Sequence, residues 1–267
     1  MRLVLLMTAS IDPKGCPDSR FSVEERRRMY VRAFKYYVKH LNDNDEDGYN
    51  AIIFAENSGA DLSEFLGSVP TCLMNRVELF ALNPADFDPS EGKGFNEAKM
   101  IDQIVDKSQL LWEEGHFVKV TGRYVVKSLA SHIRDVRRCM PNLDLYCDVK
   151  DHTIWSRLKL NWTEKWCDTR CFCARVAFYR KYLYGRYHEI GRKYWAIEQQ
   201  YFWLTRELRD TKTLKCRFSR PISIDGLNGS VTYFHGIRIP TWLDLLFFAV
   251  KDASKIIQRK IFPDLWM

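Results

Sequence analysis

The stretch FVKVTGRY at residues 117–124 carries side chains well suited to binding an anion. It reads as an apolar strand that ends in a polar tip, formed by Lys119, Thr121, Gly122 and Arg123. In an open α/β sheet, ligands bind beyond the carboxyl ends of the strands. Two cations beside a glycine that lets backbone approach a ligand suit a phosphate or a carboxylate. The alternative is an ordinary strand end with a turn glycine and two solvated cations.

A second candidate for phosphate binding lies at the start of a predicted helix, in the sequence GKGFNEAKM at residues 92–100. Gly92, Lys93 and Gly94 supply backbone N–H groups, a cation and the positive end of a helix dipole, which together favour an anion. Glu97 belongs to the same motif. The pattern is not a Walker motif, because no Ser or Thr follows the Gly-Lys pair.

Two more apolar stretches, at residues 3–7 and 51–55, also end in polar loops. These loops hold the other candidate ligand-binding residues: Thr8, Ala9, Ser10, Glu56, Asn57, Ser58 and Gly59. The carboxyl ends of parallel strands meet at one edge of a sheet. We therefore expect these loops and the Thr121 tip to lie together.

The elements that must position these loops alternate along the chain. Ser22 and Glu25 form a capping box ahead of an apolar repeat at helical spacing, whose polar face, with Arg26 and Lys35, we interpret as solvated. The later elements are a strand, a short helix, a strand, a long helix and a strand, at residues 51–55, 61–66, 77–82, 96–115 and 117–120. This alternation predicts an α/β fold with a mostly parallel sheet flanked by helices.

The composition indicates one large domain or two small ones, without a break that separates two. The chain has 267 residues, and its net charge of +7 favours anionic ligands or surfaces. The apolar run at residues 2–7 is too short for a secretory signal, and the eight cysteines are spread through a chain of ordinary core-forming size. We therefore predict a reduced, cytoplasmic protein.

The sequence CDTRCFC suggests a metal site formed by Cys167, Cys171 and Cys173. However, its spacing fits no usual zinc knuckle, and the last two cysteines alternate with a phenylalanine as strand residues do. We favour structural thiols. Asp144 and Asp148 are fallback metal ligands, although we interpret their segment as a surface loop.

Six short motifs together resemble a group of bacterial glycosyltransferases found among genes for surface polysaccharides, such as lipopolysaccharide and capsule. These motifs are ENSG at 56–59, GKGFNE at 92–97, KVTGRY at 119–124, DTRCF at 168–172, IEQQYF at 197–202 and DGLNGSVTY at 225–233. Their order and spacing carry the resemblance, which covers most of the chain up to about Tyr233.

The resemblance implies a nucleotide-sugar donor, a glycan or lipid-linked acceptor, and a fold similar to the GT-A (Rossmann-like) type with helical additions in its C-terminal half. We expect one transferase domain at 1–240 and an amphipathic helical tail at 241–267. Within the domain, a donor-nucleotide half covers about 1–128 and an acceptor-side half about 129–240. GT-A enzymes normally carry an Asp-x-Asp metal motif where this chain has Thr-Gly-Arg-Tyr.

This departure changes the expected chemistry. A leaving nucleotide develops negative charge, which either a divalent cation or fixed cationic groups must stabilise. Lys93, Lys119 and Arg123 can provide that charge. We therefore predict no protein metal site, and an enzyme that depends weakly or not at all on Mg²⁺ or Mn²⁺.

Glycosyl transfer with inversion also needs a general base for the acceptor hydroxyl. By the resemblance, Glu198 is the first candidate and Asp168 the second. The alternative for Glu198 is an ion pair with Arg192 or Arg206, and Asp168 has the alternative of pairing with Arg170.

The remaining segments leave other functions open. The basic, tryptophan-bearing stretch at 129–165 suits an acceptor-side subdomain, and we predict no nucleic-acid partner. Residues 242–266 are too short and interrupted to span a bilayer, and they predict either an amphipathic helix on the inner face of an anionic membrane or a helix docked on the domain's own core. The alternative functions are a nucleotidyltransferase, or a non-catalytic protein that binds membranes or nucleic acid.

Overall fold

The computed structural model describes residues 2–14, 21–41, 48–151 and 165–225, and Ile257. Two predictions concern segments that lie wholly or mostly outside the described residues: the tryptophans of the basic stretch, which fall at 152–164, and the tail at 241–267. In the described part of the chain, no helix is long and apolar enough to cross a membrane.

The first half of the chain alternates between strands and helices, as predicted. Its main elements are β1 (Leu3–Ala9), α1 (Val23–Lys39), β2 (Ala51–Glu56), α2 (Ser63–Gly67), β3 (Val77–Ala81), α3 (Lys93–Lys107) and β4 (His116–Thr121). Short 3₁₀ helices, η1 (Thr71–Arg76), η2 (Pro84–Asp86) and η3 (Pro89–Glu91), join α2, β3 and α3. The predicted capping box is present at α1, where Ser22 Oγ accepts from the Glu25 N–H and Glu25 accepts from the Ser22 N–H.

The second half adds short strands as well as helices. Its elements are β5 (Val125–Val126), α4 (Leu129–Cys139), η4 (Met140–Asn142), β6 (Leu145–Tyr146), β7 (Val149–Asp151), β8 (Lys165–Cys167), β9 (Cys171–Arg175), α6 (Val176–Tyr182), η5 (Arg186–Glu189), α7 (Ile197–Glu207), β10 (Leu214–Lys215) and β11 (Ile224–Asp225). The prediction of a surface loop around Asp144 and Asp148 was wrong, because β6 lies inside the main sheet and Asp148 is buried.

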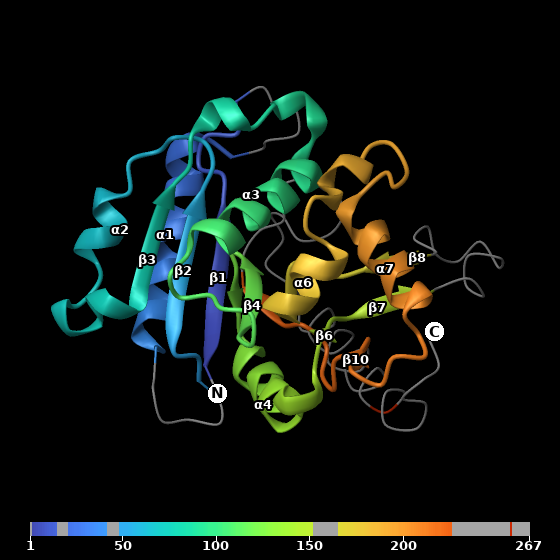
Figure 1. Ribbon diagram of the computed structural model, residues 1–267. Helices are drawn as coiled ribbons and strands as arrows, with labels where there is room; N and C mark the ends of the chain where they lie inside the picture. Colours follow the sequence, from blue (N-terminus) through green and yellow to red (C-terminus); the bar gives the residue numbers. More distant parts are fainter. Residues whose placement is uncertain (1, 15–20, 42–47, 152–164, 226–256, 258–267) are drawn as a thin grey trace, which may run out of the picture.

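The main sheet has the order β10-β6-β9-β4-β1-β2-β3. Strands β3, β2, β1 and β4 are parallel, and β9 is antiparallel to both β4 and β6. The chain proceeds outward from β1 to β3 and then returns to β4 on the other side of β1 (Figure 1). This reversal is a topological switch point, where open α/β sheets bind ligands. The α/β fold with a mostly parallel sheet flanked by helices is therefore confirmed.

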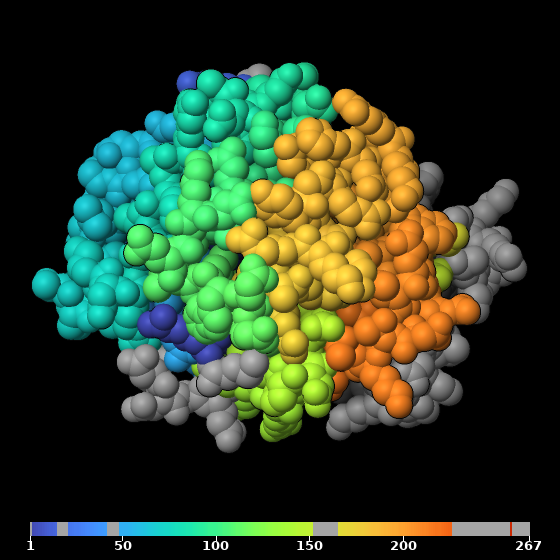
Figure 2. Space-filling view, viewed as in Figure 1, coloured from blue at the N-terminus to red at the C-terminus, as the bar shows by residue number. Residues whose placement is uncertain are grey.

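Helices cover both faces of the sheet because both faces of its strands are apolar. In β1, Leu5 and Met7 belong to the core cluster that includes α1 and α4, whereas Val4 and Leu6 belong to the cluster that includes α3, α6 and α7. Figure 1 shows α3 and α6 in front of the strands and α1 behind them. In Figure 2 the yellow and orange residues of the second half lie directly against the green residues of the first.

The two faces also separate the cysteines of the CDTRCFC motif. Cys171 and Cys173 lie in the α1-side cluster, whereas Cys167 lies in the α3-side cluster. All three thiols are buried and free. The sheet therefore keeps Cys167 away from the other two, which makes a metal site common to the three impossible.

Two helical predictions need correction. The helix predicted at 96–115 begins at Lys93 and ends at Lys107. It ends there because the Glu78 carboxylate accepts hydrogen bonds from Ser108 Oγ and from the Gln109 N–H, the next two residues. Arg26, predicted to be solvated, is buried, and its Nε donates to the carbonyl of Ser10 at 2.9 Å. It anchors the loop after β1.

Candidate functional site

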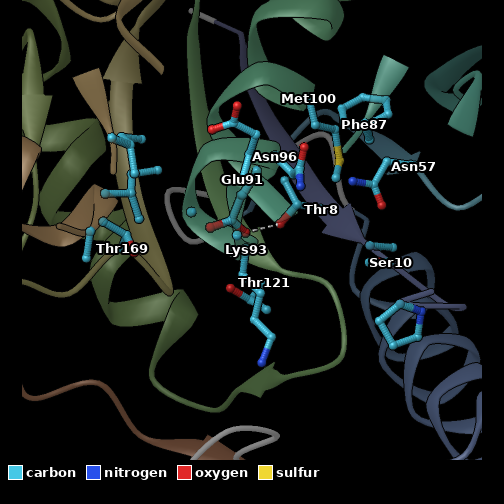
Figure 3. Close-up of a pocket in the computed structure, with 18 of the residues that line it drawn as sticks. Thr8, Ser10, Asn57, Phe87, Glu91, Lys93, Asn96, Met100, Thr121 and Thr169 are labelled. Atoms are coloured by element: carbon cyan, nitrogen blue, oxygen red, sulfur yellow. Dashed lines mark hydrogen bonds between the residues drawn. The ribbon is translucent and has the colours of Figure 1, made fainter. Parts of the chain in front are cut away.

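A cavity of about 950 Å³ lies at the carboxyl ends of β1, β2 and β4, at the switch point of the sheet. Thr8 of β1 and Thr121 of β4 are paired in register and both line it. Figure 3 shows these two residues together with Asn57 from the β2 loop and Lys93 from α3. Most of the residues predicted from the sequence line this cavity: Thr8, Ala9, Ser10, Asn57, Ser58, Lys93, Gly94, Glu97, Thr121, Arg123, Asp168 and Glu198.

Four predicted residues support the cavity from outside its lining, namely Glu56, Gly59, Lys119 and Gly122. Glu56 is fully buried, and its carboxylate accepts from the backbone N–H groups of Ile11 at 2.9 Å and Ala60 at 3.0 Å. It therefore ties the loop after β1 to the loop after β2.

Gly122 allows two strand ends to approach each other. Its N–H donates to the Thr8 carbonyl at 2.8 Å, and a Cβ at this position would lie 2.8 Å from the same oxygen. Any side chain would force these strand ends apart. The close approach at Gly122 is thus to the protein's own backbone.

Lys119 does not itself line the cavity, and its ammonium is bonded to three residues that do, Glu97, Thr121 and Thr169. Its ammonium is fully buried, 2.7 Å from Glu97 Oε1 and 2.8 Å from the Thr169 carbonyl oxygen. Glu97 Oε1 also accepts from the Thr8 hydroxyl at 2.7 Å, the bond that is dashed in Figure 3. The Lys119 charge is therefore balanced within the protein, and Lys119 links β1, α3 and the loop before β9.

Arg123 keeps its predicted place at the cavity wall. Its guanidinium stacks on the Tyr124 ring, with Cζ 4.7 Å from the ring centroid, and Nη2 donates to the Tyr124 hydroxyl. Within the described chain, the buried Nε of Arg123 has no hydrogen-bond partner. A buried guanidinium N–H without an acceptor is costly, and the positive charge of the guanidinium at the cavity wall suits an anionic ligand.

Asp168 is clamped by two cations. Arg170 donates to it from Nε at 2.8 Å and from Nη2, and Lys150 Nζ lies 3.3 Å from Oδ2. Burial alone would raise the pKa of Asp168, but the Arg170 hydrogen bonds and the Lys150 charge hold it well below its usual range. A carboxylate of such low basicity is a poor general base. The pairing with Arg170 is the alternative named from the sequence.

Glu198 has the opposite electrostatic setting. Burial raises the pKa of Glu198 above its usual range, and the charge of Glu97 adds to the rise, while its own backbone N–H, Lys119 and Thr169 oppose it. The alternative partner Arg206 instead bonds to Asp151 at 3.0 Å. Glu198 is therefore the more basic of the two candidates and lines the cavity.

The starts of α3 and α7 meet at the cavity. A Cβ on Gly94 would lie 3.1 to 3.2 Å from Ile197, so the missing side chain lets the two first turns pack closely. Helix N-termini present backbone N–H groups and a partial positive charge. Both helix starts line the cavity, where their N–H groups and Lys93 lie among the carboxylates of Glu91, Glu97 and Glu198.

Several lining residues were missed by the sequence analysis, namely Lys14, Tyr30, Lys150, Trp166, Thr169, Arg170 and Trp195. Arg170 stands inside the DTRCF motif, so that motif could have suggested it. The others come from α1, from short strands and from loops that only the tertiary fold brings together.

Among the described residues, no group of three or more His, Cys, Asp or Glu side chains has an arrangement that could hold a metal ion. Asp144 and Asp148, the fallback ligands, do not line the cavity, and Asp144 is held by Thr213 Oγ1 at 2.6 Å. The metal dependence of the protein stays a prediction.

No protein-family model and no curated protein sequence matches the chain. Solved structures resemble it distantly. Mouse xyloside xylosyltransferase 1 in its apo form is 9% identical, with a TM-score of 0.42, covering 81% of this chain and 85% of that one. The WbbM bifunctional glycosyltransferase is 10% identical, with a TM-score of 0.37, and the match covers 67% of this chain but only 32% of WbbM.

Mannose-6-phosphate isomerase from Helicobacter pylori is also similar, at 10% identity and a TM-score of 0.40, covering 68% of this chain and 74% of that one. The similarity therefore includes proteins of different activities and does not distinguish among functions.

Proposed function

We propose that this protein is a nucleotide-sugar-dependent glycosyltransferase that uses the cavity at the switch point. One observation carries the proposal: two helix N-termini with Lys93, the guanidinium of Arg123, and a carboxylate of raised pKa, Glu198, line the same cavity. Leaving-group stabilisation and proton acceptance are the two functions that glycosyl transfer needs. The motif resemblance points in the same direction.

In this proposal the nucleoside lies against the loops after β1 and β2, where Ser10 and Asn57 line the cavity. The phosphates lie between the start of α3, with Lys93, and the guanidinium of Arg123. The donor half then corresponds to about residues 1–128, and the acceptor approaches from the half at about 129–240. Asp168 serves to orient Arg170 and Lys150 rather than to accept a proton.

The reaction follows from these positions. An acceptor hydroxyl attacks the anomeric carbon, Glu198 takes the hydroxyl proton, and the bond from the anomeric carbon to the phosphate oxygen breaks. The nucleotide leaves with the bonding electron pair, and the cationic groups stabilise its charge. If a divalent cation takes part, its ligands would include the phosphates.

The first test is a thermal-shift panel of UDP, GDP, CMP and dTDP, each with Mn²⁺ and with EDTA. A ligand that binds only the native state raises the melting temperature. We expect one nucleotide to bind in EDTA. Lys93→Ala should weaken its binding about tenfold by removing one charge-assisted contact, whereas Lys107→Ala, at the exposed far end of the same helix, should not.

Failure of every nucleotide to shift the melting temperature would contradict the proposal. A shift that requires Mn²⁺ would keep the transferase but contradict the cationic, metal-independent site. A nucleotidyltransferase would use the same cavity, and the products distinguish the two activities. A glycosyltransferase releases a nucleoside phosphate from the corresponding nucleotide sugar, whereas a nucleotidyltransferase releases pyrophosphate from a nucleoside triphosphate.

The biological setting extends the proposal. We place the acceptor among glycans or lipid-linked saccharides of surface polysaccharide synthesis, and the protein in the cytoplasm or at the inner face of the membrane through residues 241–267. Sedimentation of the full chain with anionic vesicles, compared with neutral vesicles, tests the membrane part. Equal recovery with both would contradict it.

A further inference from the structure

The cavity extends to a pair of indole rings at its mouth. Trp195 is 66% exposed, the largest fraction among the exposed large hydrophobic side chains of the described residues. Its ring centroid lies 5.3 Å from that of Trp166, and both residues line the cavity. Leaving an indole in water gives up the stabilisation of burial. An aromatic pair at a cavity, with Trp195 exposed and Trp166 half-buried, therefore indicates a surface that a ligand covers.

The start of α7 fixes the distance between this pair and the candidate base. Ala196 is the N-cap, and the Trp195 N–H donates to Gln199 Oε1 at 3.3 Å across the first turn. Glu198 stands inside that same turn. The indole and the carboxylate are thus held on one short, hydrogen-bonded segment.

A residue close to Trp166 in the chain lies on the side of the cavity opposite the proposed nucleoside site. Thr169, which follows the strand of Trp166, stands across the cavity from Ser10 and Asn57 in Figure 3. The proposed nucleoside site is at those two residues. A ligand on Trp195 would then lie on the side opposite the nucleoside and next to Glu198, the group that would take the acceptor's proton.

Resting on the proposed function, we infer that Trp195 and Trp166 form the acceptor subsite, where the indoles stack on a saccharide ring. A pyranose has an apolar face of C–H groups, which fits the negative face of an indole, and an edge of hydroxyl groups. Stacked on Trp195, it presents a hydroxyl to Glu198. The acceptor is then recognised by its sugar ring, whether or not a lipid is attached to it.

The test measures saccharide binding by the full chain without a nucleotide. The probes are the methyl glycosides of glucose, galactose, mannose and N-acetylglucosamine, and the readout is saturation-transfer NMR. We expect saturation to reach the ring protons of at least one glycoside. Trp195→Ala should lower its affinity about tenfold, as expected for loss of an aromatic stacking contact, and Trp195→Phe should largely restore it.

The control is Trp203→Ala on the same helix. Trp203 is 37% exposed and packs beside Lys165 and Phe202 without lining the cavity. The Trp203→Ala variant should bind the glycoside as the wild-type chain does. Equal saturation in wild type and Trp195→Ala, or none in the wild type, overturns the subsite.

Nucleotide binding, measured with the thermal-shift panel, distinguishes failure of the saccharide subsite from failure of the proposed function. If Trp195→Ala instead weakens nucleotide binding while glycosides are unaffected, the rings stack on the nucleobase and the acceptor assignment is wrong. If no nucleotide binds but glycosides require Trp195, the saccharide site stands and the transferase proposal fails.

Discussion

The ion pair beneath the cavity allows a quantitative prediction about folding stability. Lys119 Nζ is fully buried and lies 2.7 Å from Glu97 Oε1, whose side chain is 21% exposed. At an effective dielectric constant of about 20, the attraction across this distance is roughly 6 kcal/mol, and the desolvation of the two charges offsets most of it. The pair therefore adds little net stability, but removing one partner leaves an unpaired charge.

Lys119→Met keeps the apolar stem and removes the ammonium. We expect it to lower the free energy of unfolding by about 3–5 kcal/mol, because Glu97 loses its counter-charge and the Thr169 carbonyl loses a donor. Glu97→Gln should have a cost of similar size, because the buried ammonium then has no carboxylate. The double variant should cost clearly less than the sum of the two, since it contains no unpaired charge.

Urea denaturation followed by circular dichroism measures the four free energies of the cycle. Lys107→Met is the control, since this lysine is exposed on α3 and should change stability by less than about 0.5 kcal/mol. The reasoning is refuted if Lys119→Met behaves like the control. It is also refuted if the effects of the two single substitutions simply add in the double variant.

Three further predictions concern single residues. Glu198→Gln should lower kcat about 10²- to 10⁴-fold. In the wild type, the loss of kcat on acidification should begin at a higher pH than for an ordinary carboxylate, because the base must be ionised and its pKa is raised. A pH profile of kcat that the substitution leaves unchanged would contradict this role. Gly122→Ala should lower the free energy of unfolding by roughly 1–3 kcal/mol, whereas Gly67→Ala, with open space around it, should not. Urea denaturation compares the two variants. Equal midpoints would disprove the tight contact between Gly122 and the Thr8 carbonyl oxygen. Burial raises the pKa of Asp102 from 3.8 to about 6, so its contribution to stability is complete below pH 3.8 and is lost as the pH rises through 6. Between pH 5 and 7 the free energy of unfolding of the wild type should fall by roughly 1 kcal/mol relative to that of Asp102→Asn. Parallel plots of this free energy against pH for the two proteins would rule this out.

The fold was predictable because its signals are local. Each strand at the switch point is an apolar run that ends in a polar loop, and α1 begins at a capping box. These features specify the order of strands and helices, and the rules for parallel sheets then bring the loops to one edge. The second half was less predictable, since β6 and β10 are two-residue strands that depend on β9 for their place in the sheet.

The roles of individual side chains were less predictable than their location. Strand alternation puts Lys119 on the face of Phe117, toward α3, while Val118 and Val120 face α1. That much is visible in the sequence. Its partner Glu97 comes from another element, so no local pattern shows that the charge is neutralised. Arg26 was misjudged for the same reason, because its acceptors are backbone carbonyls in the loop after β1.

Lys119 connects the two halves of the proposed mechanism. It bonds to Glu97 on the donor side and to the carbonyl of Thr169, whose side chain contacts Glu198, on the other. The switch point alone brings strand ends together, but it does not fix α7 against them. The apolar face of α7 does so, with Ile197, Tyr201 and Phe202 in the α3-side core cluster, and the charge of Lys119 limits the rise in the pKa of Glu198. Loss of Lys119 should therefore raise the pKa of Glu198 further and weaken the base at neutral pH, in addition to lowering stability.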